Sequence, residues 1–403
     1  MRLVYLIGIQ FYAFAVRVAS LWNPKAKKWV KGRQVVWDQL QAFERSNDVP
    51  AYWFHCASLG EFEQGRPLME RLKAEQDCQL VITFFSPSGY EIRKNYELAD
   101  LVVYLPKERR KNVVRFYRSI QPTKVFFIKY EFWAGYIFHA KSLGIPIYSV
   151  AAVFRSNQLF FKFWGGYMRR VLRQFDAIFV QEKTSEQLLS QINIPAIVAG
   201  DTRYDRVMSN AKKVDPYPEI ERFIQGNSVF VVGSSWAEDE AVLFPLLNDP
   251  NFSEKVIIAP HEIHESRIEA IESGLDQPSV RYSELAKGER KDAKVLIIDN
   301  IGMLMNLYQY AKVAYIGGAF GTGLHNILEP ACFGVPVIFG PDHQKFREAS
   351  VFIENGIGQS VSNFEELFRA YEQFKSADQK ATIQAFMQER TGATSLIYSA
   401  VFD

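Results

Sequence analysis

Short apolar runs recur along this chain, and stretches long enough to form helices separate many of them. The runs lie at 52–56, 80–84, 101–105, 125–128, 147–150 and 177–180 in the first half, and at 229–232, 256–259, 295–299 and 313–316 in the second. Strands of parallel sheets read as continuous apolar runs, because helices cover both faces of such a sheet. The pattern therefore predicts an α/β fold with parallel sheets, whose ligands bind beyond the carboxyl ends of the strands.

The chain has 403 residues, which is more than one hydrophobic core usually serves, so about two or three domains are expected. We predict an N-terminal segment at 1–22, a first Rossmann-like domain at 23–208 and a second at 209–403. The polar, proline-containing passage at 211–221 is typical of a crossing between two domains.

The N-terminal segment has the composition of a membrane-associated helix. Residues 3–16 are apolar except for Gly8 and Gln10, and a shorter apolar run follows Arg17. A span needs about 20 apolar residues, so spanning the bilayer and lying in its interface remain equal alternatives. Tryptophans and cations then gather as they do beside an anionic cytoplasmic leaflet, at Trp22, Lys25, Lys27, Lys28, Trp29, Lys31 and Arg33. We expect a membrane anchor that faces the cytoplasm; a buried first helix of a soluble domain is the alternative.

Charge and cysteine content exclude several classes of protein. A net charge of +2 from 47 basic and 45 acidic side chains argues against a general nucleic-acid binder, which would be markedly basic. Cys56, Cys78 and Cys332 are widely spaced among apolar neighbours, which is typical of buried thiols in a reducing compartment. His261 and His264 miss the H-E-x-x-H spacing by one residue, so no zinc site is expected.

A glycine-rich loop follows the apolar run at 313–316. It continues into His325-Asn326-Ile327-Leu328-Glu329, which predicts a helix start with Asn326 as its cap. Glycines allow a ligand to approach the main chain, and a helix start offers N–H donors and a positive dipole end, so phosphate is the expected ligand. The turn Gly233-Ser234-Ser235 before an acidic helix start is a second possible anion site.

Glu61 is a candidate general base. It follows the run at 52–56 and precedes a helix expected at 64–72. A carboxylate in a strand-to-helix loop is exposed to the ligand cleft and near the positive end of the helix, which keeps it ionised. An ordinary first-turn helix carboxylate is an equal alternative on chemistry alone.

Two stretches resemble the Kdo transferases, which add 3-deoxy-D-manno-octulosonic acid (Kdo) from CMP-Kdo to lipid A precursors. GGAFGTGLHNILEPACFGVPVIFGP is similar to their donor-side signature, and HCASLGEFEQGRPLMERL to the segment whose Ser-x-Gly-Glu motif supplies the catalytic base. The resemblance implies a GT-B glycosyltransferase: two Rossmann-like domains facing a cleft, the first binding the acceptor and the second the CMP-sugar. It also implies an inverting displacement with Glu61 as base. CMP-Kdo has a single phosphate, so neither a metal nor a cofactor is expected.

The resemblance assigns further residues, some on divergent motifs. Glu131 matches the second acid of a Glu-x-Glu-Leu-Trp-Pro-Asn segment and would orient the acceptor, although Lys129 stands where the family usually has an acid. The acceptor-binding residues would be Ser58, Gly60, Ser86, Ser88 and Gly89. The residues for the nucleotide-sugar donor would be Ser234, His264, Arg267, Gly302, Gly318, Phe320, Gly321, Gly323, His325, Asn326 and Glu329, with Glu329 on the ribose hydroxyls.

Three other functions remain alternatives. A GT-B transferase or epimerase that uses a UDP-sugar shares the G-G…H-N…E pattern loosely. A membrane-tethered nucleotide-binding scaffold without catalytic activity is disfavoured, because Glu61 is present within the expected local motif. A Rossmann oxidoreductase is disfavoured because GSSWAE, after the run at 229–232, lacks the G-x-G-x-x-G fingerprint.

Overall fold

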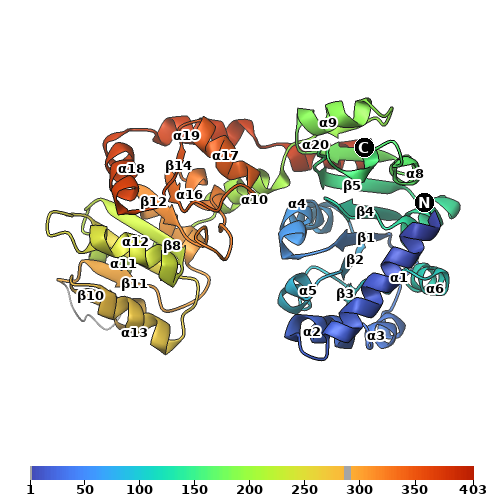
Figure 1. The fold of residues 1–403 in the computed structure, drawn as a ribbon, viewed down its shortest axis with the longest axis horizontal. Coiled ribbons are helices and arrows are strands. Elements are labelled where there is room, and N and C mark those ends of the chain that lie inside the picture. Colours follow the sequence, from blue (N-terminus) through green and yellow to red (C-terminus); the bar gives the residue numbers. More distant parts are fainter. Residues whose placement is uncertain (1, 286–291) are drawn as a thin grey trace. The chain divides into compact units, whose positions relative to one another are not determined.

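The computed structural model describes residues 2–285 and 292–403 and divides into two compact units (Figure 1). The first runs from the amino terminus to Asp205 and includes Arg390–Asp403; the second is Arg206–Glu389. Each contains a seven-stranded sheet in which all paired strands are parallel, so the predicted α/β class is confirmed. Residue 1 of the predicted N-terminal segment and residues 286–291 of the predicted second domain lie outside the described residues.

The first unit has the strand order β3-β2-β1-β4-β5-β6-β7. Its strands are β1 Ala51–Cys56, β2 Gln79–Phe84, β3 Leu101–Tyr104, β4 Lys124–Ile128, β5 Ile147–Ala152, β6 Ala177–Val180 and β7 Ile197–Val198. The sequence predicted the first six to within two residues and missed β7. The order of the strands along the chain reverses between β1 and β4, so their carboxyl ends form the switch point where open α/β sheets bind ligands.

Helices cover both faces of this sheet (Figure 1). They are α1 Arg2–Ala19, α2 Pro24–Gly32, α3 Val36–Ala42, α4 Leu59–Glu75, α5 Pro87–Arg93, α6 Arg110–Ile120, α7 Ala134–Ser142, α8 Gly166–Leu172, α9 Lys183–Ser190 and α20 Ala393–Phe402, with a 3₁₀ turn at Leu159–Phe161. Helix α4 begins at Leu59, five residues earlier than predicted, because Ser58 has an extended N-cap backbone. Helix α10, Thr202–Ala211, crosses the boundary between the units.

The carboxyl-terminal helix α20 belongs to the first unit, which corrects the predicted second domain at 209–403. Ile397, Tyr398 and Val401 are buried in the core of the first unit. Asp205 accepts hydrogen bonds from the Gly392 and Thr394 backbone N–H groups at 2.5 and 2.7 Å. The sequence of α20 is apolar, but nothing in it indicates which of the two cores it joins.

Helix α1 packs against the first unit through polar contacts. Tyr5 Oη donates to Glu108 Oε2 at 2.8 Å and accepts from the Ala134 N–H at 3.1 Å. Its other side is exposed and apolar, at Leu3, Val4, Ile7, Phe11 and Phe14. No single helix among the described residues is long and apolar enough to cross a membrane. The segments Leu3–Ala19 and Pro24–Ala42, which meet at a bend of 119°, are together long and apolar enough for a broken span, by length and composition only.

The second unit has the strand order β10-β11-β9-β8-β12-β13-β14. Its strands are β8 Val229–Ser235, β9 Lys255–Pro260, β10 Ser279–Arg281, β11 Val295–Ile297, β12 Val313–Ile316, β13 Val337–Phe339 and β14 Gly358–Ser360. Its helices are α11 Pro218–Ile224, α12 Ala237–Leu247, α13 Glu265–Gly274, α14 Tyr282–Leu285, α15 Leu304–Leu307, α16 Leu328–Cys332, α17 Arg347–Glu354, α18 Phe364–Ser376 and α19 Lys380–Glu389, with a 3₁₀ turn at Tyr308–Tyr310. Its switch point lies between β8 and β12.

Candidate active site

Glu61 lies in the first turn of α4, just beyond the carboxyl end of β1. Its Oε2 accepts a hydrogen bond of 2.5 Å from the Ala57 N–H, and the residue is only 8% exposed. The pKa of Glu61 is raised to about 8, mainly by burial and also by the Glu131 carboxylate, against the smaller lowering effects of the Ala57 N–H and Lys129. The prediction of an exposed, ionised loop carboxylate is therefore wrong, because removal from water outweighs the helix terminus.

Glu131 follows β4, the neighbour of β1 in the sheet. Its Oε2 lies 2.9 Å from His55 Nε2 and accepts a hydrogen bond of 2.5 Å from Trp133 Nε1. His55 is fully buried in β1, and its Nδ1 lies 2.8 Å from Thr83 Oγ1 of β2. These contacts tie Glu131 to three adjacent strands and hold it near Glu61. The structure thus brings the two predicted carboxylates together, and it adds His55, which the sequence reasoning missed.

Lys129 brings a cation to this carboxylate pair. It follows β4 with a left-handed backbone φ of 63°, which is uncommon for a residue other than glycine. Its ammonium nitrogen lies 5.2 Å from the centroid of the Tyr130 ring, and its charge lowers the pKa of Glu61. The departure from the expected family motif therefore favours the ionised form of the candidate base.

The loops after β1 and β2 lie side by side at this edge, because the Ser86 N–H donates to the Ala57 carbonyl oxygen at 2.7 Å. Ser58 is the N-cap of α4 but makes no side-chain capping bond. Gly60 follows in the first turn, where an added Cβ would meet nothing within 4 Å. A ligand can therefore approach the main chain at the start of α4.

Three of the predicted acceptor residues have structural roles where the chain passes from β2 into α5. Ser86 Oγ accepts from the Ser88 N–H at 3.3 Å and lies 3.0 Å from Ser88 Oγ, so this pair caps α5. Gly89 is buried, and a Cβ at this position would collide with the Phe84 ring. Close packing therefore accounts for this glycine without a ligand.

In the second unit, the loop after β12 folds back on itself. The Gly321 and Gly323 N–H groups donate to the Gly318 carbonyl oxygen at 3.3 and 2.7 Å, and the His325 N–H donates to the Gly317 carbonyl oxygen at 3.2 Å. Gly318 has a φ of 94°, and a Cβ there would collide with the Gly323 carbonyl oxygen. Only glycine fits this position without strain.

Asp239 anchors this loop, although the sequence reasoning did not identify it. It is fully buried; its Oδ2 accepts from the Gly318 and Trp236 N–H groups, and its Oδ1 from Tyr315 Oη, each at 2.9 Å. Burial raises the pKa of Asp239, and these three donors lower it. The acidic helix start after the glycine-serine turn was the signal that could have indicated this residue.

Three rings stack beside the loop. The Trp236 and His261 centroids lie 4.5 Å apart with planes at 24°, and those of His261 and His325 lie 4.6 Å apart at 30°. Trp236 Nε1 also donates to His325 Nε2 at 3.2 Å, and burial, with a further contribution from His261, lowers the pKa of His325 to about 4. His325 is therefore neutral at physiological pH. The sequence reasoning chose His264 for this region, whereas His261 is the histidine that joins the stack.

The other predicted residues near β8 and β9 differ in position. Ser234, the last residue but one of β8, has a left-handed φ of 52°. Arg267 is 13% exposed, and its Nη2 lies 2.5 Å from Glu240 Oε1, which also accepts from Ser235 Oγ at 2.8 Å. By contrast, the His264 side chain is 59% exposed and lies near Ser266 Oγ and Glu262 Oε2 of its own turn, at 3.0 and 3.3 Å. The structure thus connects Arg267, but not His264, to the β8 turn.

Helix α16 has only five residues and begins two residues beyond the predicted cap. Asn326 Oδ1 nevertheless accepts from the Leu328 N–H at 3.2 Å, and Asn326 Nδ2 donates to Glu329 Oε1 at 3.0 Å. Burial raises the pKa of Glu329, while Asn326 and Arg206 lower it. A helix this short contributes little dipole, so the loop amides are the stronger feature for an anion.

Phe320 and Gly302 complete the predicted donor set. Phe320 packs against the core of the second unit, where a Cβ at Gly340 would collide with its ring. Gly302 has a φ of 99° in an exposed turn after β11, with open space around it. Among residues 2–285 and 292–403, no group of three or more His, Cys, Asp or Glu side chains could hold a metal ion.

Comparison with solved structures identifies the fold. A UDP-GlcNAc 2-epimerase from Neisseria meningitidis matches with a TM-score of 0.56 at 16% identity, over 87% of this chain and 98% of that one. MurG from Acinetobacter baumannii matches with a TM-score of 0.54 at 14% identity, over 87% and 99%. At this identity the likeness concerns the fold alone, and it agrees with the GT-B arrangement of two Rossmann-like units.

Comparison of the sequence shows similarity to Kdo transferases over most of the chain. The family model described as 3-deoxy-D-manno-octulosonic-acid transferase (kdotransferase) matches residues 33–206. A 3-deoxy-D-manno-octulosonic acid transferase from Aquifex aeolicus is 26% identical over 352 residues, covering 85% of this chain and 91% of that protein. Another from Chlamydophila psittaci is 28% identical over 308 residues, covering 73% and 70%. These matches agree with the resemblance of the sequence to the Kdo transferases, and they support a glycosyltransferase.

Proposed function

We propose that this protein transfers Kdo from CMP-Kdo to a lipid A precursor of the lipid IVA type, in the synthesis of the lipopolysaccharide inner core. The observation that carries the proposal is the coupled pair Glu61 and Glu131 at the β1–β4 switch point. A buried carboxyl group with a pKa of about 8 is a stronger proton acceptor than an exposed one. The reaction is a single inverting displacement at the anomeric carbon of Kdo.

Glu61 acts as the general base in this proposal. Its Oε2 is held by the Ala57 N–H, so Oε1 receives the proton of the acceptor hydroxyl as attack begins. Glu131, fixed by His55 and Trp133, orients the acceptor. Because the base must first lose its own proton, kcat/KM rises with pH through about 8.

The phosphate of CMP-Kdo is assigned to the loop after β12. Here Gly318, Gly321, Gly323 and His325 already donate their N–H groups within the protein. Among the described residues, the alternate amides of Phe320, Thr322, Leu324 and Asn326 donate no such backbone hydrogen bond. We assign the departing phosphate to these amides, which stabilise its charge without a metal ion. Glu329 accepts hydrogen bonds from the ribose.

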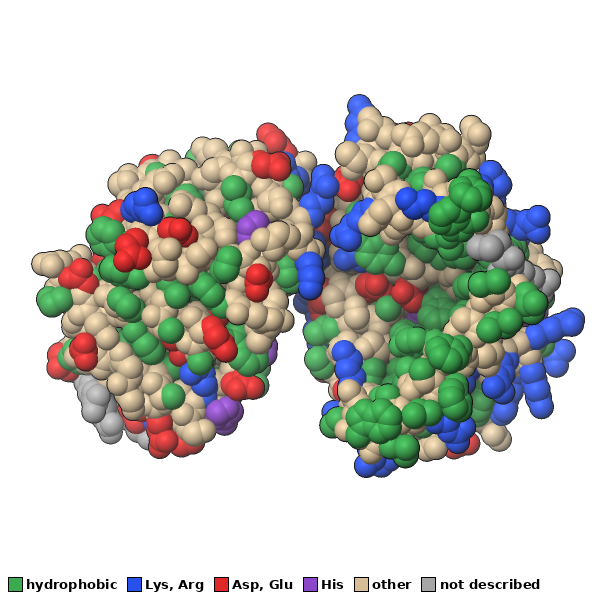
Figure 2. Space-filling view, viewed as in Figure 1, with side chains coloured by type: hydrophobic (Ala, Val, Ile, Leu, Met, Phe, Trp, Pro, Cys, Tyr) green, Lys and Arg blue, Asp and Glu red, His purple; other side chains and the backbone are tan. Residues whose placement is uncertain are grey.

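The membrane surface is the proposed location, on the cytoplasmic face of the inner membrane. Figure 2 shows hydrophobic side chains gathered where α1 and α2 lie, with Lys and Arg side chains beside them. Apolar side chains enter the headgroup region while the cations meet anionic lipid. A Phe11→Ser, Phe14→Ser double variant should sediment less with anionic vesicles than the wild type; equal sedimentation would contradict the location.

The decisive experiment measures product formed from CMP-Kdo and a tetraacylated lipid A precursor by the purified protein and by Glu61→Ala. Loss of one general base typically lowers the rate by about 10²–10⁴-fold, while CMP binding should be unchanged. A parallel reaction with UDP-sugars tests the alternative of a transferase or epimerase that uses a UDP-sugar. The reason to test it is the fold shared with UDP-GlcNAc 2-epimerases. Turnover of a UDP-sugar without Kdo transfer would overturn the proposal.

A further inference from the structure

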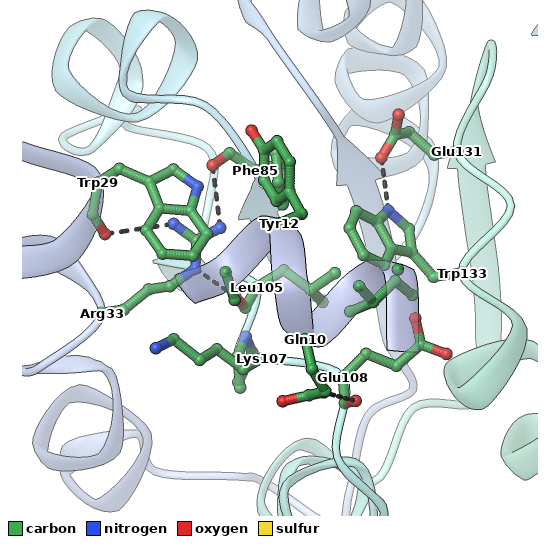
Figure 3. Close-up of a pocket in the computed structure, with 14 residues that line it drawn as sticks. Gln10, Tyr12, Trp29, Arg33, Phe85, Leu105, Lys107, Glu108, Glu131 and Trp133 are labelled. Carbon is green, nitrogen blue, oxygen red and sulfur yellow. Dashed lines mark hydrogen bonds between the residues drawn. The ribbon is translucent and has the colours of Figure 1, made fainter. Parts of the chain in front are cut away.

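A pocket of about 370 Å³ lies beside the carboxylate pair, between α1 and the carboxyl edge of the first sheet (Figure 3). Residues of α1 and α2 line it together with the segments that follow β2, β3 and β4. Trp29 and Arg33 lie on one side in Figure 3, and Trp133 and Glu131 on the other. The volume falls within the range of small-molecule sites, which are mostly apolar with a few polar groups.

Three of the four charged groups that line this pocket, Arg33, Glu108 and Glu131, already have hydrogen-bond partners within the protein. Arg33 donates to the carbonyl oxygens of Phe85, Leu105 and Trp29 at 2.9, 3.1 and 3.3 Å, and its guanidinium carbon lies 3.8 Å from the Trp29 ring centroid. Burial lowers the pKa of Arg33 to about 9. Because each of its three nitrogens already donates to a carbonyl oxygen of the protein, Arg33 is held in place as a wall of the pocket.

The two carboxylates of the lining are engaged as well. Glu131 contacts His55 and Trp133, as described above. Glu108 is 4% exposed and accepts from Tyr5 Oη and the Gly135 N–H. With these charges satisfied, the surface presented to a ligand is largely apolar, from residues such as Ile9, Ala13, Phe85, Leu105, Pro106 and Trp133.

One buried donor in the lining lacks a partner. Trp29 is 5% exposed, and its Nε1–H meets no acceptor among the described residues. In Figure 3 the indole nitrogen lies on the side of the ring toward Phe85 and Tyr12, which also line the pocket. A buried N–H without an acceptor is costly and rare, so a ligand oxygen at this point would satisfy it.

Cations lie around the Trp29 end of the pocket. Lys107 lines the pocket with its ammonium nitrogen 5.8 Å from the Trp29 ring centroid. Burial lowers the pKa of Lys107, and the charges of Arg17, Arg109 and Arg33 lower it further, so these four cations are close together. The chemistry of the site thus combines an apolar interior, one unpaired donor and a cationic surrounding.

We propose that this pocket binds one fatty-acyl chain of the acceptor glycolipid, with the ester or amide carbonyl oxygen of that chain accepting from Trp29 Nε1. The inference rests on the proposed function. Methylene groups fill the apolar interior, and the anionic head of the glycolipid meets the cations around Lys107. Glu131 lines the same pocket and lies near Glu61, so a seated chain holds the acceptor hydroxyl beside the base. The exposed apolar face of α1 lets the chain enter from a lipid surface.

Filling the pocket tests the inference. Ala13→Phe places a ring in the lining, whereas Ala15→Phe places the same ring at an exposed position of α1 outside it. Because the ring displaces two or more methylene groups from the pocket, KM for the acylated acceptor should rise by about tenfold or more in Ala13→Phe. In Ala13→Phe, KM for the fully deacylated glycolipid should change by less than about twofold. Ala15→Phe should have the KM of the wild type for the acylated and for the deacylated acceptor.

A binding measurement separates the pocket from the chemistry. Bromine-labelled dodecanoic acid should quench the fluorescence of Trp29 and Trp133 in the wild type and in Ala15→Phe, but not in Ala13→Phe. Trp29→Phe keeps a ring beside Arg33 and should weaken binding of the probe by removing the donor.

The outcomes distinguish the two proposals. Quenching without Kdo transfer to any acceptor would overturn the proposed function and leave the pocket standing. The opposite result has two parts: Kdo transfer depends on the acyl chain length of the acceptor equally in Ala13→Phe and Ala15→Phe, and the probe does not quench the wild type. Together they would overturn the acyl pocket while the proposed function stands.

Discussion

Two opposing influences act on the Glu61 carboxyl group. The start of α4 and the Ala57 N–H favour its ionised form, whereas burial and the neighbouring Glu131 favour its protonated form. A helix terminus contributes about 0.3–1 kcal/mol at an exposed site, and a shift of the pKa from 4.5 to about 8 corresponds to several times that energy. Burial is therefore the main influence on the protonation state of Glu61 in the free protein, and Lys129 partly opposes the rise in the pKa.

The stability of the protein should depend on pH through this group. The folded pKa of about 8 lies above the unfolded value near 4.5, so the stabilising contribution is full below about pH 4.5 and is lost as pH rises through about 8. The side chain of Glu61→Gln cannot ionise, so this variant does not lose that contribution as pH rises. The free energy of unfolding of the variant minus that of the wild type should therefore be about 1–3 kcal/mol larger at pH 9 than at pH 6. Urea unfolding at the two pH values measures this difference.

A matched control lies on the same helix. Glu75, whose side chain is 43% exposed and pairs with Arg71 at 2.7 Å, should give no such gain when changed to Gln. If the difference between Glu61→Gln and the wild type stays constant from pH 6 to 9, Glu61 does not hold its proton in the folded protein.

At the scale of the loop after β12, one glycine maintains a network of backbone hydrogen bonds. Gly318→Ala introduces a Cβ at a φ of 94° that collides with the Gly323 carbonyl oxygen. We expect a loss of about 1–3 kcal/mol in stability and a severalfold weaker binding of CMP, because the loop amides proposed to bind its phosphate lose their alignment. Calorimetric titration with CMP and thermal unfolding measure the two effects.

Gly356 provides the comparison. It has a left-handed φ of 66°, and an added Cβ would meet nothing within 4 Å. Gly356→Ala therefore carries the strain of the backbone without the collision, and CMP should bind it as it binds the wild type. If Gly318→Ala and Gly356→Ala bind CMP with equal affinity, the conformation of the loop after β12 does not determine nucleotide binding.

Strands within continuous apolar runs could be predicted from the sequence, whereas the short strands β7 and β14 could not. The runs at 313–316 and 177–180 coincide with β12 and β6, because four consecutive buried side chains leave a clear signal. Strands β7 and β14 have two and three residues, too few to show any period, and they form because a neighbouring strand offers hydrogen bonds. Tertiary pairing, which is absent from local sequence, determines such elements.

The candidate site divides in the same way. The sequence predicted Glu61 and Glu131 through local motifs, since each follows a recognisable strand. It missed His55 and Asp239, because their importance comes from contacts with residues distant in the chain, Glu131 and Gly318. It also chose His264 over His261, since spacing along the chain does not reveal which ring stacks on Trp236.

At the scale of the whole molecule, the chain returns to its first unit after completing the second. Helix α20 buries Ile397, Tyr398 and Val401 in the first core, and Asp205 holds its start. Sequence order alone suggests that the last helix belongs with the residues before it. The apolar face of α20 fits either core by composition, and only the packed structure distinguishes them.

Ile397→Asp should therefore destabilise the first unit and not the second. Ile397 is fully buried, and an unpaired charge at this position should lower the stability of the first unit by about 3 kcal/mol or more. Leu396, 39% exposed on the same helix, should tolerate the same change within about 0.5 kcal/mol. Amide hydrogen exchange reports each unit separately: protection should fall in β1 and β4 of Ile397→Asp and persist in β8 and β12. Loss of protection in β8 and β12 instead would mean that the last helix stabilises the second unit, as chain order suggests.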